Sequence, residues 1–498
     1  MTKNIILKSL FASTYIETFK LSNDSAFDRC RRMLPFQVEW LTQLIQTILG
    51  FGPALMMPII LFLLSIIFRQ PIGKSLRSAV TVGVAFVGIF AVLGAVFGVL
   101  GPAVQQMVNR TGIELAGLDI GWPLTSAITW ASKIAPLIIP IGFIVNIIML
   151  IFNFTKTFDA DLWNYWHWAF TAVMVQFATG SAILGIIAAI ITEIVILLLA
   201  DWVVPTSQPF FNIPGTSLPH TETTNWAPVT FALDKIIRKI PGIQDIKADP
   251  ESIRERLGFF GEPMMLGVYV GLFLGFLAYG LQLSKVYELA IYTGALLLLE
   301  GRMIGILMEG LMPIADGISE FFSKSERFKG REIYIGIDAG PVGLASPSAV
   351  AAGLILIPVY VAMTFLPGNR ILPLADLAII PVLIMWSLAS SGGNLVKGLI
   401  NGFIVSLLVM AFTNSFAGPL TDAAKAINYE LPPGAQVVSS LDAGAHIFPW
   451  IIMTIFINAV KFNIKGLLIG IIAAVLYFGC WWWAKDMPKV VAKELEES

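Results

Sequence analysis

Charged residues are scarce in this sequence of 498 amino acids. Asp, Glu, Lys and Arg together make up 13% of it and hydrophobic residues make up 56%, whereas a soluble domain has about 25% charged residues. A water-soluble fold of this length could not bury so much apolar surface, which excludes the soluble globular classes. The net charge of −1 gives no basis for a nucleic-acid partner, and we expect none.

Cysteine is almost absent as well. Cys30 and Cys480 are the only two, and neither has a Cys or His partner at the spacing of a disulfide, a zinc site or a CxxC redox motif. We therefore expect no metal and no cofactor. The three histidines are scattered and do not supply the metal or nucleophile constellation of a membrane-embedded enzyme. An enzyme with all its catalytic groups on this chain is accordingly the least favoured function.

Long apolar runs dominate the rest of the sequence, and runs of roughly 20 residues are typical of membrane-spanning helices. The fold class that they predict is an all-α integral membrane protein with about eleven transmembrane helices and with broken or re-entrant segments. The apolar stretch 446–460 is too short to cross and is expected to re-enter the membrane or to lie at its surface. The expected spans are residues 44–68, 79–100, 130–152, 165–179, 181–201, 263–281, 287–308, 335–366, 372–390, 397–414 and 464–484.

Basic residues occur in alternate loops, which predicts the orientation because Lys and Arg are retained on the cytoplasmic side of a membrane. Clusters follow the first, fifth, seventh and last expected spans. They predict a multi-pass protein of the bacterial inner (cytoplasmic) membrane with its N-terminus outside and its C-terminus in the cytoplasm. The residues are Arg69, Lys74 and Arg77; Lys235, Arg238, Lys239, Lys247, Arg254 and Arg256; Lys324, Arg327, Lys329 and Arg331; and Lys485, Lys489 and Lys493.

Two pairs of similar motifs predict an internal repeat. Phe51-Gly-Pro resembles Phe260-Gly-Glu-Pro, and Asp119-Ile-Gly-Trp-Pro resembles Asp338-Ala-Gly-Pro at a similar offset. Five expected spans separate the copies, and an odd number of spans inverts the second copy relative to the first. A five-plus-five inverted repeat is typical of alternating-access transporters, whose substrate site lies near the membrane midplane. We therefore expect a transporter of a small hydrophilic solute.

The repeat and the loops together predict how the chain is divided. The basic stretch 235–256 is either a docking surface for a soluble partner or a solvated connector. For residues 1–32, the alternatives are a polar N-terminal extension and a start codon placed too early. The expected segments are this extension (1–32), a first membrane repeat (33–201), a cytoplasmic insert (202–261), a second membrane repeat (262–414), a final loop with a re-entrant piece and the last span (415–484), and a cytoplasmic tail (485–498).

Polar side chains that follow Pro219 are candidates for a substrate site, because an unpaired charge in hydrocarbon costs several kcal/mol and persists only beside protein or water. His220, Thr221, Glu222 and Asn225 form a line of hydrogen-bond donors and acceptors. A neutral polyhydroxylated solute needs both kinds of group along its length. The alternative is a polar loop that has this composition by chance.

Asp338 lies in a Gly/Pro-rich passage, residues 337–348, that cannot be helical throughout. Broken backbone at membrane depth is tolerated only beside a cavity. We expect Asp338 to accept hydrogen bonds from substrate hydroxyls, with capping of the following helix as the alternative. In the matching motif of the first repeat, Trp122 offers a flat face to the C–H side of a polyol or belongs to the interfacial aromatic belt. Ser126 is a further candidate contact.

Two more residues are candidates for the site. Glu262, at the start of the sixth expected span, either lines the site or complements a helix dipole. Like Asp338, it is also a candidate proton acceptor when a hydroxyl attacks phosphorus. His167, within Trp163-Asn-Tyr-Trp-His, is either a site residue or an interfacial histidine.

At these motifs the chain resembles the membrane-spanning IIC component of the galactitol phosphotransferase system, which is related to the ascorbate IIC permeases. Several rare Trp, His, Pro and Asp residues occur in the same order and spacing. The likeness begins near Met33 and extends to the C-terminus. The matching stretches are Gly52-Pro53, Asp119 to Pro123, Thr129 to Ser132, Trp163 to His167, Phe177 to Ser181, Pro219-His220, Lys239 to Gly242, Gly258 to Pro263, Gly336 to Asp338 and Pro367 to Pro373.

This resemblance implies a homodimeric permease, embedded in membrane lipid, that binds galactitol or a related polyol from outside. A galactitol-type IIB protein, charged through IIA, HPr and enzyme I, then transfers a phosphoryl group from its own phosphocysteine to the solute. By similarity to the ascorbate permeases, His220, Thr221 and Asp338 contact substrate, while the residues after His220 differ from the ascorbate pattern and favour a polyol. The alternative function is an ion-coupled secondary transporter of a small polar solute.

Overall fold

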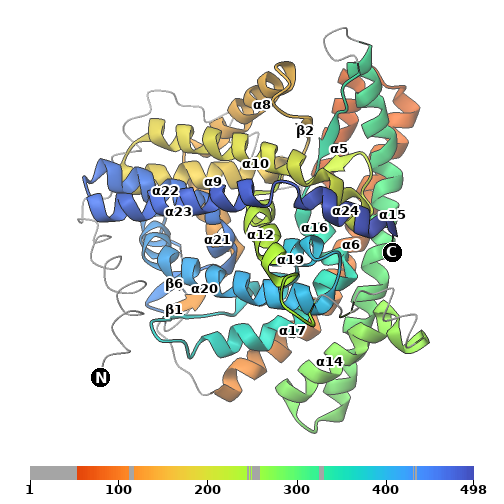
Figure 1. Ribbon diagram of the computed structural model, residues 1–498, viewed down its shortest axis with the longest axis vertical. Coiled ribbons are helices and arrows are strands. Elements are labelled where there is room, and N and C mark those ends of the chain that lie inside the picture. The colour runs from red at the N-terminus through yellow and green to blue at the C-terminus, as the bar shows by residue number, and fades with distance from the viewer. Residues whose placement is uncertain are drawn as a thin grey trace.

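The computed structural model is built mainly from helices, with six short strands (Figure 1). It describes residues 53–111, 117–243, 258–324, 330–429 and 435–497, together with residues 246, 248 and 431. The expected extension 1–32, the Phe51 motif and the start of the first expected span lie outside the described residues. A mostly helical chain with long apolar helices agrees with the expected class of membrane protein.

Four helices form a bundle at the right-hand side of Figure 1. They are α5 (Pro53–Ile67), α6 (Ile72–Thr111), α14 (Pro263–Tyr279) and α15 (Leu283–Ser323). At 40 and 41 residues, α6 and α15 are much longer than the expected spans, and each measures about 60 Å, twice the hydrocarbon thickness of a bilayer. A stripe of small residues, Gly267, Gly271 and Gly275, lets α14 approach α15 closely, as small residues do between membrane helices.

Six strands form two parallel three-stranded sheets. One sheet has the order β5-β1-β6 and the other β2-β4-β3, so each takes its central strand from one half of the chain and its outer strands from the other. The registers align Asp119 with Ser439 and Asp159 with Gly336. The strands are β1 (Gly117–Asp119), β2 (Thr157–Asp159), β3 (Thr216–Ser217), β4 (Tyr334–Gly336), β5 (Ile371–Leu372) and β6 (Val437–Ser439).

Bent helix pairs follow the two central strands. After β1, α7 (Trp122–Ala131) and α8 (Ala135–Ile151) meet at 91°, and after β4, α16 (Ala339–Ala345) and α17 (Pro347–Met363) meet at 85°. In both pairs a proline stands in the first turn of the second helix, where its missing N–H is harmless. In the second pair the residue before it, Ser346, is extended. The expected spans 130–152 and 335–366 are therefore each part of a bent pair rather than one straight helix.

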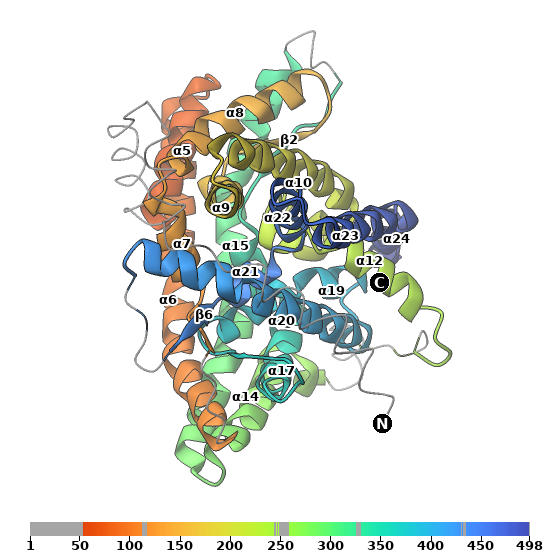
Figure 2. The same ribbon diagram turned by 90° about the vertical axis from the view of Figure 1, so that its left-hand side faces the viewer.

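The remaining helices pack around the two sheets (Figure 2). Residues 372–390, expected as one span, form three short helical pieces, and Pro381 in the first turn of the second piece separates it from the first. The helices are α9 (Leu162–Thr179), α10 (Ala182–Phe211), α11 (Thr221–Thr224), α12 (Ala227–Ile237), η1 (Gly258–Gly261), η2 (Ala375–Ile379), α18 (Ile380–Leu383), α19 (Met385–Ser390), α20 (Leu395–Ala426), α21 (Leu441–Ala445), α22 (Ile447–Val460), α23 (Ile464–Trp483) and α24 (Met487–Glu497).

Four of the described helices, α6, α10, α20 and α23, are long and apolar enough to cross a membrane, and six spans result if each bent pair counts as one. Every expected span overlaps at least one described helix. Residues 447–460 form the 14-residue helix α22, which is shorter than a membrane-spanning helix. The protein therefore combines long apolar helices with broken segments, as expected.

Much of the described part of the expected insert 202–261 is buried. Residues 202–211 complete α10, and β3, α11 and most of α12 are buried. Arg238, from the basic stretch, pairs with Asp234 and with Glu494 of α24. The expected tail likewise forms a helix that packs on α10, where Thr206 donates a hydrogen bond to the carbonyl of Pro488. Several polar groups of this segment are paired within the protein, as those of Thr216, Thr224 and Asn225 show.

Candidate functional site

A helix begins within a few residues of the end of every strand. Because the strands in each sheet are parallel, their carboxyl ends lie at one edge and the helix N-termini gather there. Exposed N–H groups at helix N-termini favour acidic and polar neighbours. This is where the structure places Asp119, Asp161, His220, Asp338 and Asp376.

The three histidines of the chain lie in one line of contacts. The Nδ1 atom of His167 is 2.9 Å from Nε2 of His446, and its Nε2 is 3.0 Å from Nε2 of His220. His167 is on α9, His220 precedes α11 and His446 lies between α21 and α22. All three are buried. The fold has brought together residues that are 53 and 279 positions apart in sequence.

Asp338 joins this line from the second half of the chain. Its Oδ1 atom is 3.1 Å from His220 Nε2 and also accepts a 2.8 Å hydrogen bond from the N–H of Gly340, which caps α16. No hydrogen bond among the described residues reaches Oδ2. Asp338 also lines a small cavity with Asp161 and Pro341, between α16 and the long helices α6 and α15. A carboxylate oxygen is thus left available beside a cavity.

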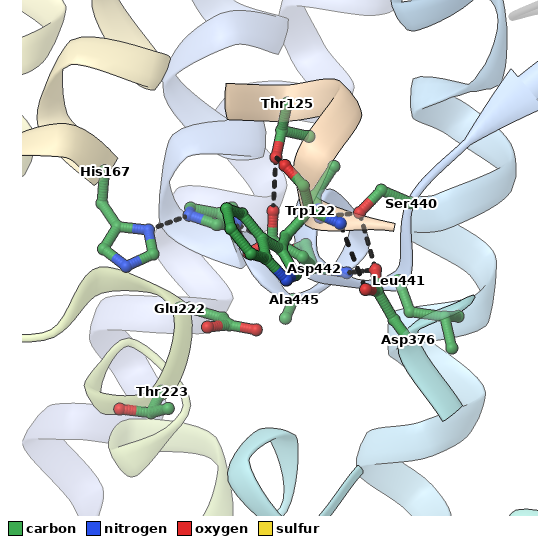
Figure 3. Close-up of polar contacts among 12 residues, drawn as sticks. Trp122, Thr125, His167, Glu222, Thr223, Asp376, Ser440, Leu441, Asp442 and Ala445 are labelled. Carbon is green, nitrogen blue, oxygen red and sulfur yellow. Dashed lines mark hydrogen bonds and ion pairs between the residues drawn. The ribbon is translucent and has the colours of Figure 1, made fainter. Parts of the chain in front are cut away.

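Asp442 and Asp376 form a second acidic group, in which Asp442 lies between His167 and Asp376 (Figure 3). Asp376 accepts hydrogen bonds from Ser440 Oγ at 2.8 Å and from the backbone N–H groups of Trp122 and Asp442. Asp442 in turn accepts a 2.8 Å hydrogen bond from Thr125 Oγ1. These bonds tie α7 of the first half to η2 and α21 of the second half.

Two predicted contacts carry polar atoms without a partner. Thr221 Oγ1 and Glu222 Oε1 are buried, and neither has a hydrogen bond in the described part of the structure. A buried polar atom without a partner costs about 1–3 kcal/mol. Such atoms are therefore candidates to receive hydrogen bonds from a ligand.

Comparison with known proteins identifies relatives of this chain. A family model described as the PTS system sugar-specific permease component (EIIC-GAT) matches residues 47–434. A protein of Escherichia coli (strain K12) named a permease IIC component is 36% identical over 434 residues, which cover 86% of this chain and 97% of that protein. The galactitol-specific EIIC component of the same strain is 33% identical over 450 residues, which cover 90% of this chain and 98% of that protein. The same figures hold for the galactitol-specific EIIC component of Escherichia coli O157:H7.

The chain belongs to the EIIC permease family of the phosphotransferase system. It is an integral membrane permease component, and as such it works with a IIB component. The resemblance inferred from the sequence motifs is confirmed, and so is the expected function as a membrane component of this transport system.

The permease brings together only some of the predicted site residues. His167, His220, Thr221, Glu222 and Asp338 lie around the histidine line. Glu262 is different, because it precedes α14 in the long-helix bundle, and no hydrogen bond or ion pair among the described residues joins it to His220.

Asn225, Trp122 and Ser126 have other surroundings. Both ends of the Asn225 side chain are engaged, since its amide nitrogen donates to the carbonyls of Glu222 and Ala445 and its oxygen accepts from the N–H of Phe448. The Trp122 side chain is half-exposed and meets Trp163 edge-to-face, at 6.2 Å between ring centroids. Ser126 is partly buried on α7.

His446, Asp376 and Asp442 are site residues that the sequence analysis did not select. All three are ionisable residues in apolar surroundings, and in membrane segments such residues usually have a function. That signal was present in the sequence. Their grouping depends on the exchange of strands between the two halves and has no counterpart in local sequence spacing.

The same side chains have the composition of a metal site. The ligand atoms of His167, His220 and Glu222 lie within 4.8 Å of one another, and so do those of His167, Asp442 and His446. Imidazole and carboxylate are ordinary ligands of divalent transition metals. The ring nitrogens already lie at hydrogen-bonding distance from one another.

Proposed function

We propose that the permease translocates galactitol or a related polyol and presents it to phosphorylated, galactitol-type IIB on the cytoplasmic side. Two relatives that share 33% of their residues with this chain are named galactitol-specific EIIC components. A polyol carries a hydroxyl on every carbon, so its site needs several donors and acceptors at close range. His220, Thr221, Glu222 and Asp338 supply such a set.

The observation that carries this proposal is the meeting of His220 and Asp338 beside a cavity. One comes from each half of the chain, so a movement of one half relative to the other changes the site directly. Asp338 Oδ2, Thr221 Oγ1 and Glu222 Oε1 are the acceptors that a hydroxylated solute would engage. Of the two acidic candidates, Asp338 adjoins the histidines and Glu262 does not, so Asp338 is the better candidate for a hydrogen bond from the reacting hydroxyl.

We further propose about eleven membrane spans in a five-plus-five inverted repeat. The order of elements supports this proposal. In both halves a helix pair is followed by a strand, a bent pair, a second strand, a helical segment, a long helix, a third strand, a short helix and a further helix. The first half contains α5 to α12 in this order, and the second half contains α14 to α22. The two central strands, β1 and β4, occupy equivalent places in their sheets.

The proposed location is the bacterial inner membrane, with the N-terminus outside and the C-terminus in the cytoplasm. Contacts between loops are consistent with this scheme. Lys156 pairs with Glu332 at 2.8 Å, and both belong to loops assigned to the cytoplasmic side. Hydrogen bonds from Lys156 and Tyr334 hold the pKa of Glu332 below its usual value. On the other side, Arg110 donates to the carbonyl of Leu277. Fusion of a reporter enzyme to the C-terminus tests the assignment, since activity outside the cell would contradict it.

A homodimer is the proposed assembly. The long-helix bundle exposes apolar side chains, among them Leu63, Ile67, Val80 and Val84 on α5 and α6. Such a surface faces either lipid or a second copy in a membrane. Cross-linking in native membranes tests the proposal, and a species of one chain only would count against it.

Transport by membrane vesicles tests the function itself. Right-side-out vesicles that contain the permease, purified IIB, IIA, HPr, enzyme I and phosphoenolpyruvate are expected to accumulate galactitol as its phosphate. Vesicles without IIB provide the control and are expected to accumulate none. Uptake of unmodified galactitol driven by an ion gradient, without IIB or phosphoenolpyruvate, would instead support the ion-coupled secondary transporter.

A further inference from the structure

The line of histidines has a direction that follows from its hydrogen bonds. His446 Nδ1 lies 2.7 Å from the carbonyl oxygen of Asp442, which can only accept, so this nitrogen carries a proton. In a neutral ring, Nε2 of His446 is then an acceptor and must receive the Nδ1 proton of His167. Each assignment determines the next one along the line.

The same reasoning applies to the other two rings. Neutral His167 carries its one ring proton on Nδ1, so its Nε2 atom accepts a hydrogen bond. The donor of that hydrogen bond is Nε2 of His220. The Nδ1 atom of His220 is left with a lone pair, 3.3 Å from the hydroxyl of Thr223. One arrangement therefore keeps all three rings neutral and every ring nitrogen paired. In this arrangement each ring donates its hydrogen bond in the direction from His220 towards Asp442.

We propose that these histidines form a proton relay for the phosphorylation step, in which the proton of the attacking hydroxyl enters at His220 and is passed through His167 to His446. This inference rests on the proposed function, since it assigns a route to a proton that the reaction must release. The hydroxyl oxygen forms a bond to phosphorus while the bond between phosphorus and its donor on IIB breaks, and that electron pair stays with the donor. The hydroxyl proton is left over and binds to Nδ1 of His220.

The remaining transfers need no other reactant. His220 passes its Nε2 proton to His167, and His167 passes its Nδ1 proton to Nε2 of His446. His446 then carries two protons beside Asp442, whose Oδ1 atom is 4.0 Å from His446 Nδ1. Asp338 and Glu222 face the relay near His220, at its start, and Asp442 faces it at His446, its end. These carboxyl groups stabilise the positive charge while it crosses the site.

A relay explains why His167 and His446 are buried although neither is required to contact the solute. Burial of a polar ring is costly unless both nitrogens have partners. The partners of His167 are the other two rings, and those of His446 are His167 and the carbonyl of Asp442. A metal held between His167 and His220 is the competing use of the same atoms, because it would take the lone pairs that the relay uses.

The experiment replaces relay rings by a side chain that forms hydrogen bonds but does not transfer protons. Full-length permease with His167→Gln, and separately with His446→Gln, is reconstituted into proteoliposomes and supplied with phosphorylated IIB and galactitol. Thr171→Val is the matched control, because Thr171 lies one turn from His167 on α9 and bonds only to the His167 carbonyl among the described residues. Galactitol affinity, phosphorylation rate and the solvent deuterium isotope effect are measured for each variant.

We expect both glutamine variants to bind galactitol within about twofold of the wild type while phosphorylation slows by about 100-fold, as is usual when acid–base assistance is lost. Added imidazole is expected to restore part of the rate in His167→Ala. Thr171→Val should match the wild type in both measurements.

Three results would overturn the relay. One is a His167→Gln variant that phosphorylates galactitol at the wild-type rate, and another is an equal loss of affinity and rate, which indicates a structural role. The third is a stoichiometric metal ion in the wild-type permease that is lost in His167→Gln. The wild-type rate with galactitol reports separately on the proposed function, whereas the ratio of variant to wild-type rates reports on the relay.

Discussion

Asp338 takes one of the two roles that its sequence context allowed, the helix cap, and is placed for the other. It caps α16 through the N–H of Gly340, and the same oxygen approaches His220. The two interpretations of its motif, helix cap and substrate contact, are therefore compatible. A capping aspartate keeps its position without a ligand, so the site is arranged before the solute arrives.

Asp338→Asn and His220→Ala are expected to weaken galactitol binding by about 10- to 100-fold, because hydrogen bonds to a charged group contribute about 1.5–3 kcal/mol. Asparagine caps helices as well as aspartate does, so the Asp338→Asn variant should remain folded. Equilibrium binding to purified permease measures the affinity, and the thermal midpoint reports on folding. Asp486→Asn, at an exposed position, is the control. Unchanged affinity in either variant would remove that residue from the site.

At the scale of elements, close packing of helices depends on small residues. A Cβ atom at Gly271 would lie 2.6 Å from the Cα atom of Ala290 on α15 and would also meet the hydroxyl of Thr293. Neither neighbour can move without shifting α15, because Thr293 itself donates to carbonyls of both helices. The position therefore has no room for a methyl group.

Gly271→Ala is accordingly expected to destabilise the permease by about 1–3 kcal/mol through overpacking. Gly479→Ala provides a matched control, since a Cβ atom there has no neighbour within 4 Å. Thermal unfolding in detergent, followed by loss of the monodisperse species, measures both. Equal midpoints for the two variants would show that α14 and α15 separate easily at this contact.

At the scale of the whole molecule, basic residues gather at one end of α23. The Lys235 ammonium donates to the carbonyl of Trp483, and the Lys239 ammonium lies 5.9 Å from the centre of the Trp483 ring. Arg238 is committed to Asp234 and Glu494, so it stabilises the junction of α12 and α24 rather than offering a free charge. Lys239 is exposed and is the better test of docking.

Lys239→Glu is expected to weaken binding of IIB several-fold at low salt, with a smaller effect at physiological salt because exposed charges are screened there. The control is Lys465→Glu, which makes the same change at the opposite end of the 20-residue helix α23, about 30 Å away. Surface plasmon resonance with permease in nanodiscs measures both. Equal IIB binding by the two variants would favour the alternative that the basic stretch is only a connector.

Local sequence was sufficient to predict those features that depend only on residues close together in the chain. Apolar runs predicted a helical membrane protein because the hydrocarbon core requires them, and the Gly/Pro-rich passage 337–348 predicted a broken helix because proline cannot continue one. His220 and Asp338 were selected because ionisable residues between apolar segments are costly in a membrane and are therefore usually functional. The spacing of rare residues also identified the family.

Only the tertiary structure decided which of these residues meet. The sheets combine strands from both halves, and this exchange places His446 next to His167 and Asp376 next to Trp122, although more than 250 positions separate the members of each pair. Parallel pairing between strands of two or three residues leaves almost no local pattern, because so short a strand shows no period of its own. The apolar composition thus determined that the chain crosses a membrane. The pairing of distant strands determined where its polar side chains converge.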